Sequence, residues 1–512
     1  MNIIKYILSM GLLLIAIISF GQDFLTSDDA RYQQIKVVFE KLATASGNSR
    51  TSPTLRVEDK NEGKKIIANY DKKIYAITTE VELYELLQRK YGVRTDDALA
   101  IILGHELAHF YQNHASGHNC LTHNLSSAQE GEADKLGLYY TFQAGYQTAD
   151  IASEVLREVY INYELSENEQ CGYPDLKERD SIMQVAITEV RKAVEFYETA
   201  NFLLMLQEYQ KAAILYEYVS KSFPTAELFN NIGVAYTRMG TEKMNLTLQY
   251  PLLIEEFTIL SIQNVDAVNL VGDNNKILEN YNKATIAFKQ AINLDDKYAL
   301  GYLNLSCLSH LMQMIDKDFN YIHDRTYCLE KYKSNSGNEE YYYLMDAIIH
   351  YDEGRIQEAK ETIEKAKSIN NNASIRANHC IIHKNNCNTF TKGLTLQPII
   401  IKESQSKSVW AGGADYFAEI HTIMTDTLSD NYYLQFDAAN NGRRYYWEQR
   451  KYEVQEIKGL SKDKIETKMG QPDLIILTKE HEIFSYQGSQ LLLFFIGEVQ
   501  ETYHYRYRII EK

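Results

Sequence analysis

The sequence predicts a multidomain protein that is mainly α-helical with β parts, and three observations support this fold class. The chain has 512 residues, enough for about three domains of ordinary size. Apolar residues recur with helical spacing up to about residue 374, whereas short alternating or continuous apolar runs dominate from residue 375 onward. Hydrophobic residues make up 45% of the chain and aromatic residues 12%, which is enough material for packed interiors.

The N-terminal segment has the pattern of a signal peptide. Lys5 precedes an apolar run from Tyr6 to Phe20, and Ser19 and Gly21 supply the small residues that a signal peptidase requires. We therefore expect residues 1–21 to be removed and the mature protein to be exported, with no integral span remaining. An uncleaved anchor is the alternative, but roughly 15 apolar residues fall short of the ~20 that cross a bilayer.

Residues 22–191 are predicted to form an α+β domain. A strand is expected near Ile74–Thr79. A helix is expected from about Asp97 to His114, where apolar residues recur after possible capping residues. A second helix should run from Ser127 to Ala144, with Gly145 as its C-cap.

Residues 192–374 are predicted to form helical hairpins, because small and aromatic residues recur there at the offsets of tetratricopeptide repeats. The segment that begins at Ala226 carries such residues at offsets 7 and 8, and its partner helix follows only after an insertion at about residues 242–280. A generic helical bundle is the alternative. The positions that fit the repeat pattern are Ala212, Tyr216, Pro224, Phe229, Ile232, Gly233, Tyr236, Ala284, Phe288, Ala291, Ala347, Gly354, Ala359, Ile363 and Ala366.

Residues 375–512 predict a small β-rich domain that contains one short helix ending near Gly470 and Pro472. The six cysteines allow disulfides in an exported chain, and one of the 15 complete pairings joins Cys380 with Cys387, Cys307 with Cys328, and Cys120 with Cys171. The formal net charge of -16 argues against nucleic acid or an anionic membrane surface as the main partner, because phosphate binding needs clustered Lys and Arg. Proteins or peptides are the expected partners.

The stretch "LGHELAHFYQNH" places His105, Glu106 and His109 on one predicted helix. Residues four apart lie on one helical face, so the two histidines can share a tetrahedral metal ion. Glu106 lies between them, where a carboxylate can deprotonate a metal-bound water. This spacing predicts a zinc site.

A third ligand is expected on the second helix, where Glu130 and Asp134 are also four residues apart. The long metzincin pattern is excluded because Gln112 and Ala115 stand where it requires Gly and His. Three further histidines lie at no required offset and are interpreted as ordinary exposed side chains: His114, His118 and His123. Glu132 is interpreted as a solvated neighbour.

Together, "ALAIILGHELAHFYQNH" and "SAQEGEADKLGLYYTFQAGY" resemble the HtpX and BepA-like zinc metallopeptidases, a gluzincin family with HExxH and ExxAD motifs. The resemblance covers about residues 64–185. It implies Glu130 as the third zinc ligand, Glu106 as the general base, and Asp134 as a carboxylate that orients a ligand histidine. An exported peptidase domain followed by tetratricopeptide repeats is also the layout of BepA-like periplasmic proteases that act on outer-membrane protein assembly.

The chain departs from this family in two respects. Only 20 residues separate His109 from Glu130, where family members often carry longer insertions, so a trimmed and more open cleft is expected. Family members tend to carry His-Pro with an Arg five residues after the proline, whereas this chain has Tyr173, Pro174 and Arg179. The Tyr173 hydroxyl is therefore a candidate catalytic group in place of the histidine, and a packing role is the alternative.

The predicted function is an exported, most simply periplasmic, zinc metalloendopeptidase that hydrolyses peptide bonds with one Zn²⁺ per chain. The resemblance further implies envelope protein quality control, with the repeats recruiting substrates or an assembly partner. The alternative is a catalytically idle tetratricopeptide adaptor, although an idle site would have no need of Glu106. A membrane-anchored protease is the third option, if the N-terminal segment is retained.

Overall fold

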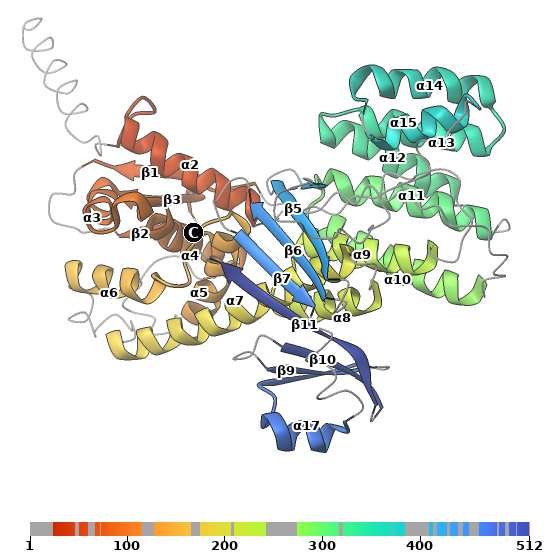
Figure 1. The fold of residues 1–512 in the computed structure, drawn as a ribbon. Helices are drawn as coiled ribbons and strands as arrows, with labels where there is room; N and C mark the ends of the chain where they lie inside the picture. Colours follow the sequence, from red (N-terminus) through yellow and green to blue (C-terminus); the bar gives the residue numbers. More distant parts are fainter. Residues whose placement is uncertain are drawn as a thin grey trace, which may run out of the picture. The chain divides into compact units, whose positions relative to one another are not determined.

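The computed structural model describes residues 24–46, 51–59, 67–71, 73–114, 127–164, 175–205, 209–241, 274–316, 321–371, 373–384, 409–412, 417–426, 431–438, 444–449, 460–478, 481–486, 491–497 and 499–510. Over these residues the protein is mainly helical with two sheets, which confirms the coarse fold class (Figure 1). The described residues up to Arg191 form one compact unit, and those from Lys192 form a second.

A three-stranded sheet lies in the first unit, in the order β1 (Thr54–Glu58), β3 (Ala76–Glu80), β2 (Ala68–Asp71). Strand β1 runs parallel to β3, and β2 pairs antiparallel with β3 at an edge of the sheet. The predicted strand at Ile74–Thr79 corresponds to β3, which begins later because Tyr75 adopts a positive φ of 51° in the turn after β2.

The helices of the first unit surround one central helix, α4 (Thr95–Tyr111). Contacts with α4 come from α2, α3, α5, α6 and β2, so each of its residues is buried or half-buried. A helix that is apolar on all sides belongs in a core, and this explains why the sequence of α4 shows little amphipathic contrast. The other helices are α2 (Ala30–Ala45), α3 (Val81–Tyr91), the 3₁₀ turn η1 (Gly92–Arg94), α5 (Ser127–Gln143), α6 (Ala152–Asn162) and α7 (Leu176–Met205), which continues into the second unit.

The end of α5 matches the predicted C-cap. Gly145 has a positive φ of 80°, and the backbone N–H of Tyr146 donates to the carbonyl of Thr141 at 2.9 Å. The N–H of Gly145 donates to Phe142 at 2.9 Å. These two bonds form the Schellman motif that commonly ends a helix at glycine.

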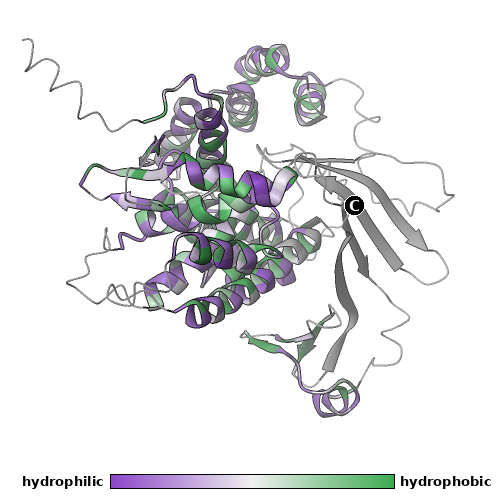
Figure 2. Cartoon of the chain, turned by 90° about the vertical axis from the view of Figure 1, so that its left-hand side faces the viewer, coloured by the Kyte–Doolittle hydropathy of each residue, from purple (hydrophilic) through white to green (hydrophobic). Residues whose placement is uncertain are grey.

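The second unit contains helices that pack against their neighbours in the sequence. The coloured helices carry hydrophobic and hydrophilic residues together (Figure 2). Helices α9 and α10 approach closely, because the ring of Phe288 lies against Gly233 and the ring of Tyr281 lies against Gly240. The predicted insertion falls mostly outside the described residues. The helices are α8 (Tyr209–Ser220), α9 (Ala226–Thr241), α10 (Asn274–Leu294), α11 (Ala299–Ile315), α12 (Ile322–Ser336), α13 (Glu340–Asp352), α14 (Ile356–Ile369) and α15 (Ala373–Ile382).

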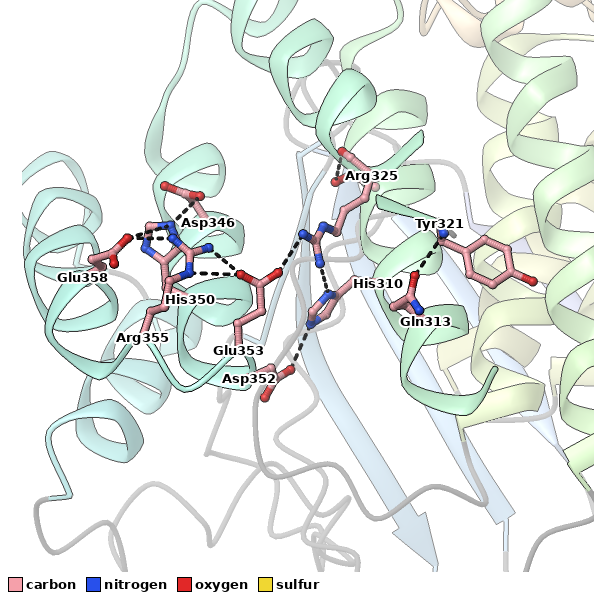
Figure 3. A network of polar contacts seen from close by, with 11 residues as sticks. His310, Gln313, Tyr321, Arg325, Asp346, His350, Asp352, Glu353, Arg355 and Glu358 are labelled. Atoms are coloured by element: carbon pink, nitrogen blue, oxygen red, sulfur yellow. Dashed lines mark hydrogen bonds and ion pairs between the residues drawn. The ribbon is translucent and has the colours of Figure 1, made fainter. Parts of the chain in front are cut away.

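A chain of polar contacts joins α11, α12 and α13 (Figure 3). Arg325 donates from Nη1 to Nδ1 of His310 at 3.0 Å and from Nη2 to Glu353 at 2.8 Å. Because Nδ1 of His310 accepts this bond, its Nε2 carries the proton and donates to Asp352 at 3.0 Å. The side chains of His310 and Arg325 are buried, so the network replaces water as their hydrogen-bonding environment.

The C-terminal strands form an eight-stranded antiparallel sheet in the order β4-β5-β6-β7-β11-β10-β9-β8. The predicted short helix is α17 (Lys462–Met469), which ends at Gly470 with a positive φ of 85°. Ile465 of α17 packs with Phe484 and Leu493 in a hydrophobic core. The strands are β4 (Val409–Gly412), β5 (Phe417–Asp426), β6 (Asn431–Ala438), β7 (Arg444–Gln449), β8 (Leu474–Leu477), β9 (Glu482–Tyr486), β10 (Leu491–Ile496) and β11 (Val499–Ile510).

Of the six cysteines, Cys120, Cys171 and Cys387 lie outside the described residues. The pairing of Cys307 with Cys328 is wrong: both are buried free thiols, and burial raises the pKa of Cys307 above its usual range and that of Cys328 to about 12. Cys380 is disulfide-bonded. Among the helices that the structure describes, none combines the length and the apolar character that a bilayer crossing requires.

Candidate metal centre

Helix α4 brings His105 and His109 together. Their Nε2 atoms lie 2.9 Å apart, so both ring nitrogens point at one place beside the helix. The imidazole rings meet nearly edge to face, with centroids 4.5 Å apart. This is the geometry expected of two donors one helical turn apart that serve a common ligand.

Helix α5 supplies the third donor, Glu130. Its Oε2 lies 3.5 Å from Nε2 of His105, and its Oε1 lies 3.5 Å from Nε2 of His109. Close contact between the two helices makes this possible, since a Cβ at Gly137 would lie 2.7 Å from the backbone nitrogen of His105. Only glycine allows the backbones to approach in this way.

The three side chains fit a zinc ion. Two imidazoles and one carboxylate are a common donor set for catalytic zinc, which leaves the fourth position open. Bonds of about 2.0–2.1 Å in a tetrahedral site place donor atoms about 3.3 Å apart. The measured separations of 2.9 and 3.5 Å bracket this value. His109 and Glu130 are buried and His105 is half-buried, so the site is shielded from bulk water on its protein side.

Asp134 lies behind His105 rather than among the converging donors. Its Oδ1 accepts a hydrogen bond from Nδ1 of His105 at 2.9 Å, which fixes the tautomer and leaves the Nε2 lone pair for a metal. Arg179 pairs with both carboxylates: its Nη2 lies 2.7 Å from Oδ1 of Asp134 and 3.3 Å from Oε2 of Glu130. The side chains of Asp134, Arg179 and Glu130 are almost completely buried.

His114 orients His109, a role that the sequence analysis missed. The interpretation of His114 as an exposed histidine is wrong, since only 5% of its surface is accessible. Its Nδ1 lies 2.9 Å from Nδ1 of His109, and its Nε2 lies 3.3 Å from Oε2 of Glu132. The carboxylate of Glu132 places the proton on Nε2 of His114. Nδ1 of His114 then accepts from His109, whose Nε2 lone pair is left for a metal.

The end of α4 explains how His114 reaches this position. Asn113 adopts a left-handed φ of 57°, which turns the chain back over the last helical turn. The N–H of Asn113 donates to Phe110 at 3.1 Å, and the N–H of His114 donates to His109 at 3.0 Å. This Schellman motif ends the helix at Tyr111, short of the predicted His114. Asn is the non-glycine residue best suited to the left-handed position, so Asn113 was the available signal.

Glu106 is held by the edge strand of the sheet. Its Oε2 accepts a hydrogen bond from the backbone N–H of Tyr70 in β2 at 3.0 Å. That N–H points away from β3, because it bonds to a side chain outside the sheet. No local pattern links residues 70 and 106, so this contact could not be predicted from the sequence. Tyr173, the other predicted catalytic residue, lies outside the described residues.

The buried charges control the protonation of the site. Burial opposes a charge on Glu130, but hydrogen bonds from His105 and His109 and the charge of Arg179 hold its pKa well below the usual range. Burial likewise opposes a charge on His105, yet bonds to Asp134 and Glu130 raise its pKa to about 10. Burial and the neighbouring His109 lower the pKa of His114. The electrostatic environment of His105 therefore favours positive charge, which a divalent cation can supply.

The site combines three converging metal donors, two side chains that orient the ligand imidazoles, Asp134 and His114, and the adjacent carboxylate of Glu106. Comparison with the models of known protein families and with curated proteins found no match for this chain.

Proposed function

We propose that this protein is an exported zinc metalloendopeptidase. The observation that carries the proposal is the convergence of His105, His109 and Glu130 on one point, with Glu106 next to the first ligand on the same helix. A structural zinc site would be closed by a fourth protein ligand, whereas among the described residues three donors converge, which leaves one position for water or substrate. The similarity of the sequence motifs to HtpX and BepA-like peptidases supports the same conclusion.

Each residue then has a defined task in peptide-bond hydrolysis. A zinc ion bound by the three donors would supply Lewis acidity toward the scissile carbonyl and a water molecule. Glu106 would take a proton from the attacking water as the water oxygen bonds to the scissile carbonyl carbon, and would return that proton to the amine as the C–N bond breaks. Since its Oε2 is held by the N–H of Tyr70, Oε1 is the atom that carries the proton. Asp134 and His114 keep the ligand imidazoles in the tautomer that binds metal.

The rest of the chain supports an extracytoplasmic role in protein quality control. The disulfide at Cys380 fits an oxidising compartment such as the periplasm. Sequential helical hairpins in residues 192–374 offer a surface on which protein substrates or an envelope assembly partner can dock. The net charge of -16 agrees with protein rather than nucleic-acid partners.

The decisive experiment compares the purified mature protein with its Glu106→Gln variant on a fluorogenic casein substrate. We expect activity to fall 10² to 10⁴-fold, the usual worth of general-base catalysis, with zinc content unchanged. Glu82→Gln, an exposed carboxylate on α3, is the matched control and should retain activity. The idle-adaptor alternative expects no cleavage by the native protein and full rescue of a deletion strain by Glu106→Gln. Observing both would overturn the proposal.

A further inference from the structure

A second group of side chains that could hold a metal ion lies on α14 and at the end of α15. His379 is on α15, and His383 follows its last residue. The N–H of His383 donates to the carbonyl of His379 at 3.0 Å, so the helical hydrogen-bond pattern extends to it. Both imidazoles therefore project from one face, as at His105 and His109. Glu364 of the packed neighbour α14 faces them.

The donor atoms converge on one carboxylate oxygen. Nε2 of His379 lies 2.6 Å from Oε1 of Glu364, and Nε2 of His383 lies 3.4 Å from the same atom. The two rings lie side by side with centroids 4.3 Å apart and a tilt of 32°. Ligand atoms of all three residues lie within 4.8 Å of one another, which a tetrahedral ion with bonds near 2.0–2.2 Å can span after small side-chain movements.

Hydrogen bonding alone does not account for this cluster. Nε2 of His383 is buried and has no hydrogen-bond partner among the described residues, because its approach to Glu364 does not meet the geometry of a hydrogen bond. Buried polar atoms are almost always satisfied by protein, water or an ion. An orphaned ring nitrogen aimed at a carboxylate is therefore an observation that a ligand would explain.

Lys367 places a positive charge beside the cluster. Its Nζ lies 3.3 Å from Nε2 of His379 and 4.0 Å from Oε2 of Glu364. The Lys367 side chain is 37% exposed, so it can turn into solvent when an ion takes its place. Burial and the charge of His379 lower the pKa of His383, which favours the neutral imidazole that binds metal.

We propose that Glu364, His379 and His383 form a second binding site for a divalent transition-metal ion, Zn²⁺ in the first instance. Imidazole and carboxylate donors suit this class of ion. A metal ion bound there would cross-link α15 to α14 and so stabilise the packing of α15. Cys380 lies between the two histidines and is disulfide-bonded, so two cross-links would act on one short helix. This inference does not depend on the proposed peptidase activity.

The test counts zinc ions in the full mature protein by elemental analysis after equilibration with micromolar free Zn²⁺ and gel filtration. We expect two ions per chain in the native protein. His105→Ala with His109→Ala should leave one ion, which the further changes His379→Ala and His383→Ala should remove. Zinc should also raise the melting temperature of the variant that lacks only the first site.

Glu364→Gln serves as the conservative variant, because it preserves shape while removing the anionic donor. It should weaken the second site at least tenfold. Its matched control is Glu361→Gln on the same helix, whose carboxylate bonds to Gln357 and not to the histidines. One zinc ion in the native protein that disappears with His105 and His109 would overturn the inference. Equal zinc binding by the Glu364 and Glu361 variants would do the same.

Discussion

Replacing Gly137 by alanine should separate α4 from α5 and damage the metal centre without touching a ligand. A Cβ at this position would lie 2.7 Å from the nitrogen of His105, 2.8 Å from the carbonyl carbon of Gly104 and 2.9 Å from Cα of His105. These are backbone atoms, so no side-chain rotation can relieve the overlap. Because favourable contacts between carbon atoms begin near 3.5 Å, the helices must move apart by about 0.7 Å.

The expected magnitudes follow from this displacement. Overpacking of a well-packed core costs about 1–3 kcal/mol, and the better helix propensity of alanine returns up to about 1 kcal/mol. We expect a net loss of about 1–2 kcal/mol in the free energy of unfolding. Metal sites tolerate only about 0.2 Å of error in ligand distances, so a 0.7 Å shift of Glu130 should weaken zinc binding on the order of 100-fold.

Gly131 provides the matched control on the same helix. A Cβ there would meet only Cγ2 of Ile182, at 3.3 Å, and this methyl group can yield. Gly131→Ala should therefore keep zinc affinity and melt at the same or a higher temperature. Zinc competition titration and thermal unfolding measure both quantities. If Gly137→Ala binds zinc and melts like the native protein, the close crossing does not position Glu130 and the reasoning fails.

Three further predictions concern the buried polar contacts. Asp134→Asn should weaken zinc binding 10 to 100-fold and destabilise the fold, because Arg179 loses its charged partner; an unchanged zinc titration would contradict this. His114→Phe should weaken zinc binding about tenfold by freeing the ring of His109, and Glu132→Ala should have a smaller effect in the same direction, because its half-exposed carboxylate only sets the tautomer of His114; an unchanged zinc titration for His114→Phe would argue against the orienting role. Arg325→Met should cost about 1–3 kcal/mol and speed hydrogen exchange in α13 specifically, and uniform exchange would refute the link drawn in Figure 3.

The sequence predicted the parts of the site that depend on helical spacing. His105, Glu106 and His109 lie within one turn, so their arrangement follows once the segment is a helix. The interval between Glu130 and Asp134 follows in the same way. Which of the two carboxylates binds the metal depends on how α4 packs against α5. This packing places Glu130 near the Nε2 atoms of both histidines and Asp134 near Nδ1 of His105. Spacing along one helix carries no information about that crossing.

Contacts that depend on chain reversals or tertiary packing could not be predicted. His114 was misjudged because a helix continued through residue 114 would point it elsewhere, whereas the left-handed Asn113 folds it back onto His109. The contact of Tyr70 with Glu106 joins a sheet edge to a helix 36 residues later. Glu364 and the pair His379 and His383 lie on different helices in the same way, and only the packing of α14 on α15 makes them a cluster.

The two buried thiols of the second unit, Cys307 and Cys328, affect how the chain reaches its correct pattern of disulfides. Thiolates carry out disulfide exchange, and burial with raised pKa values removes Cys307 and Cys328 from that reaction once α11 and α12 have folded. Six cysteines can pair completely in fifteen ways, but four can do so in only three. Early folding of these helices therefore reduces the number of complete disulfide pairings about fivefold. A substitution that slows the folding of α11 should accordingly reduce the yield of correctly oxidised protein, even though neither thiol belongs to a disulfide.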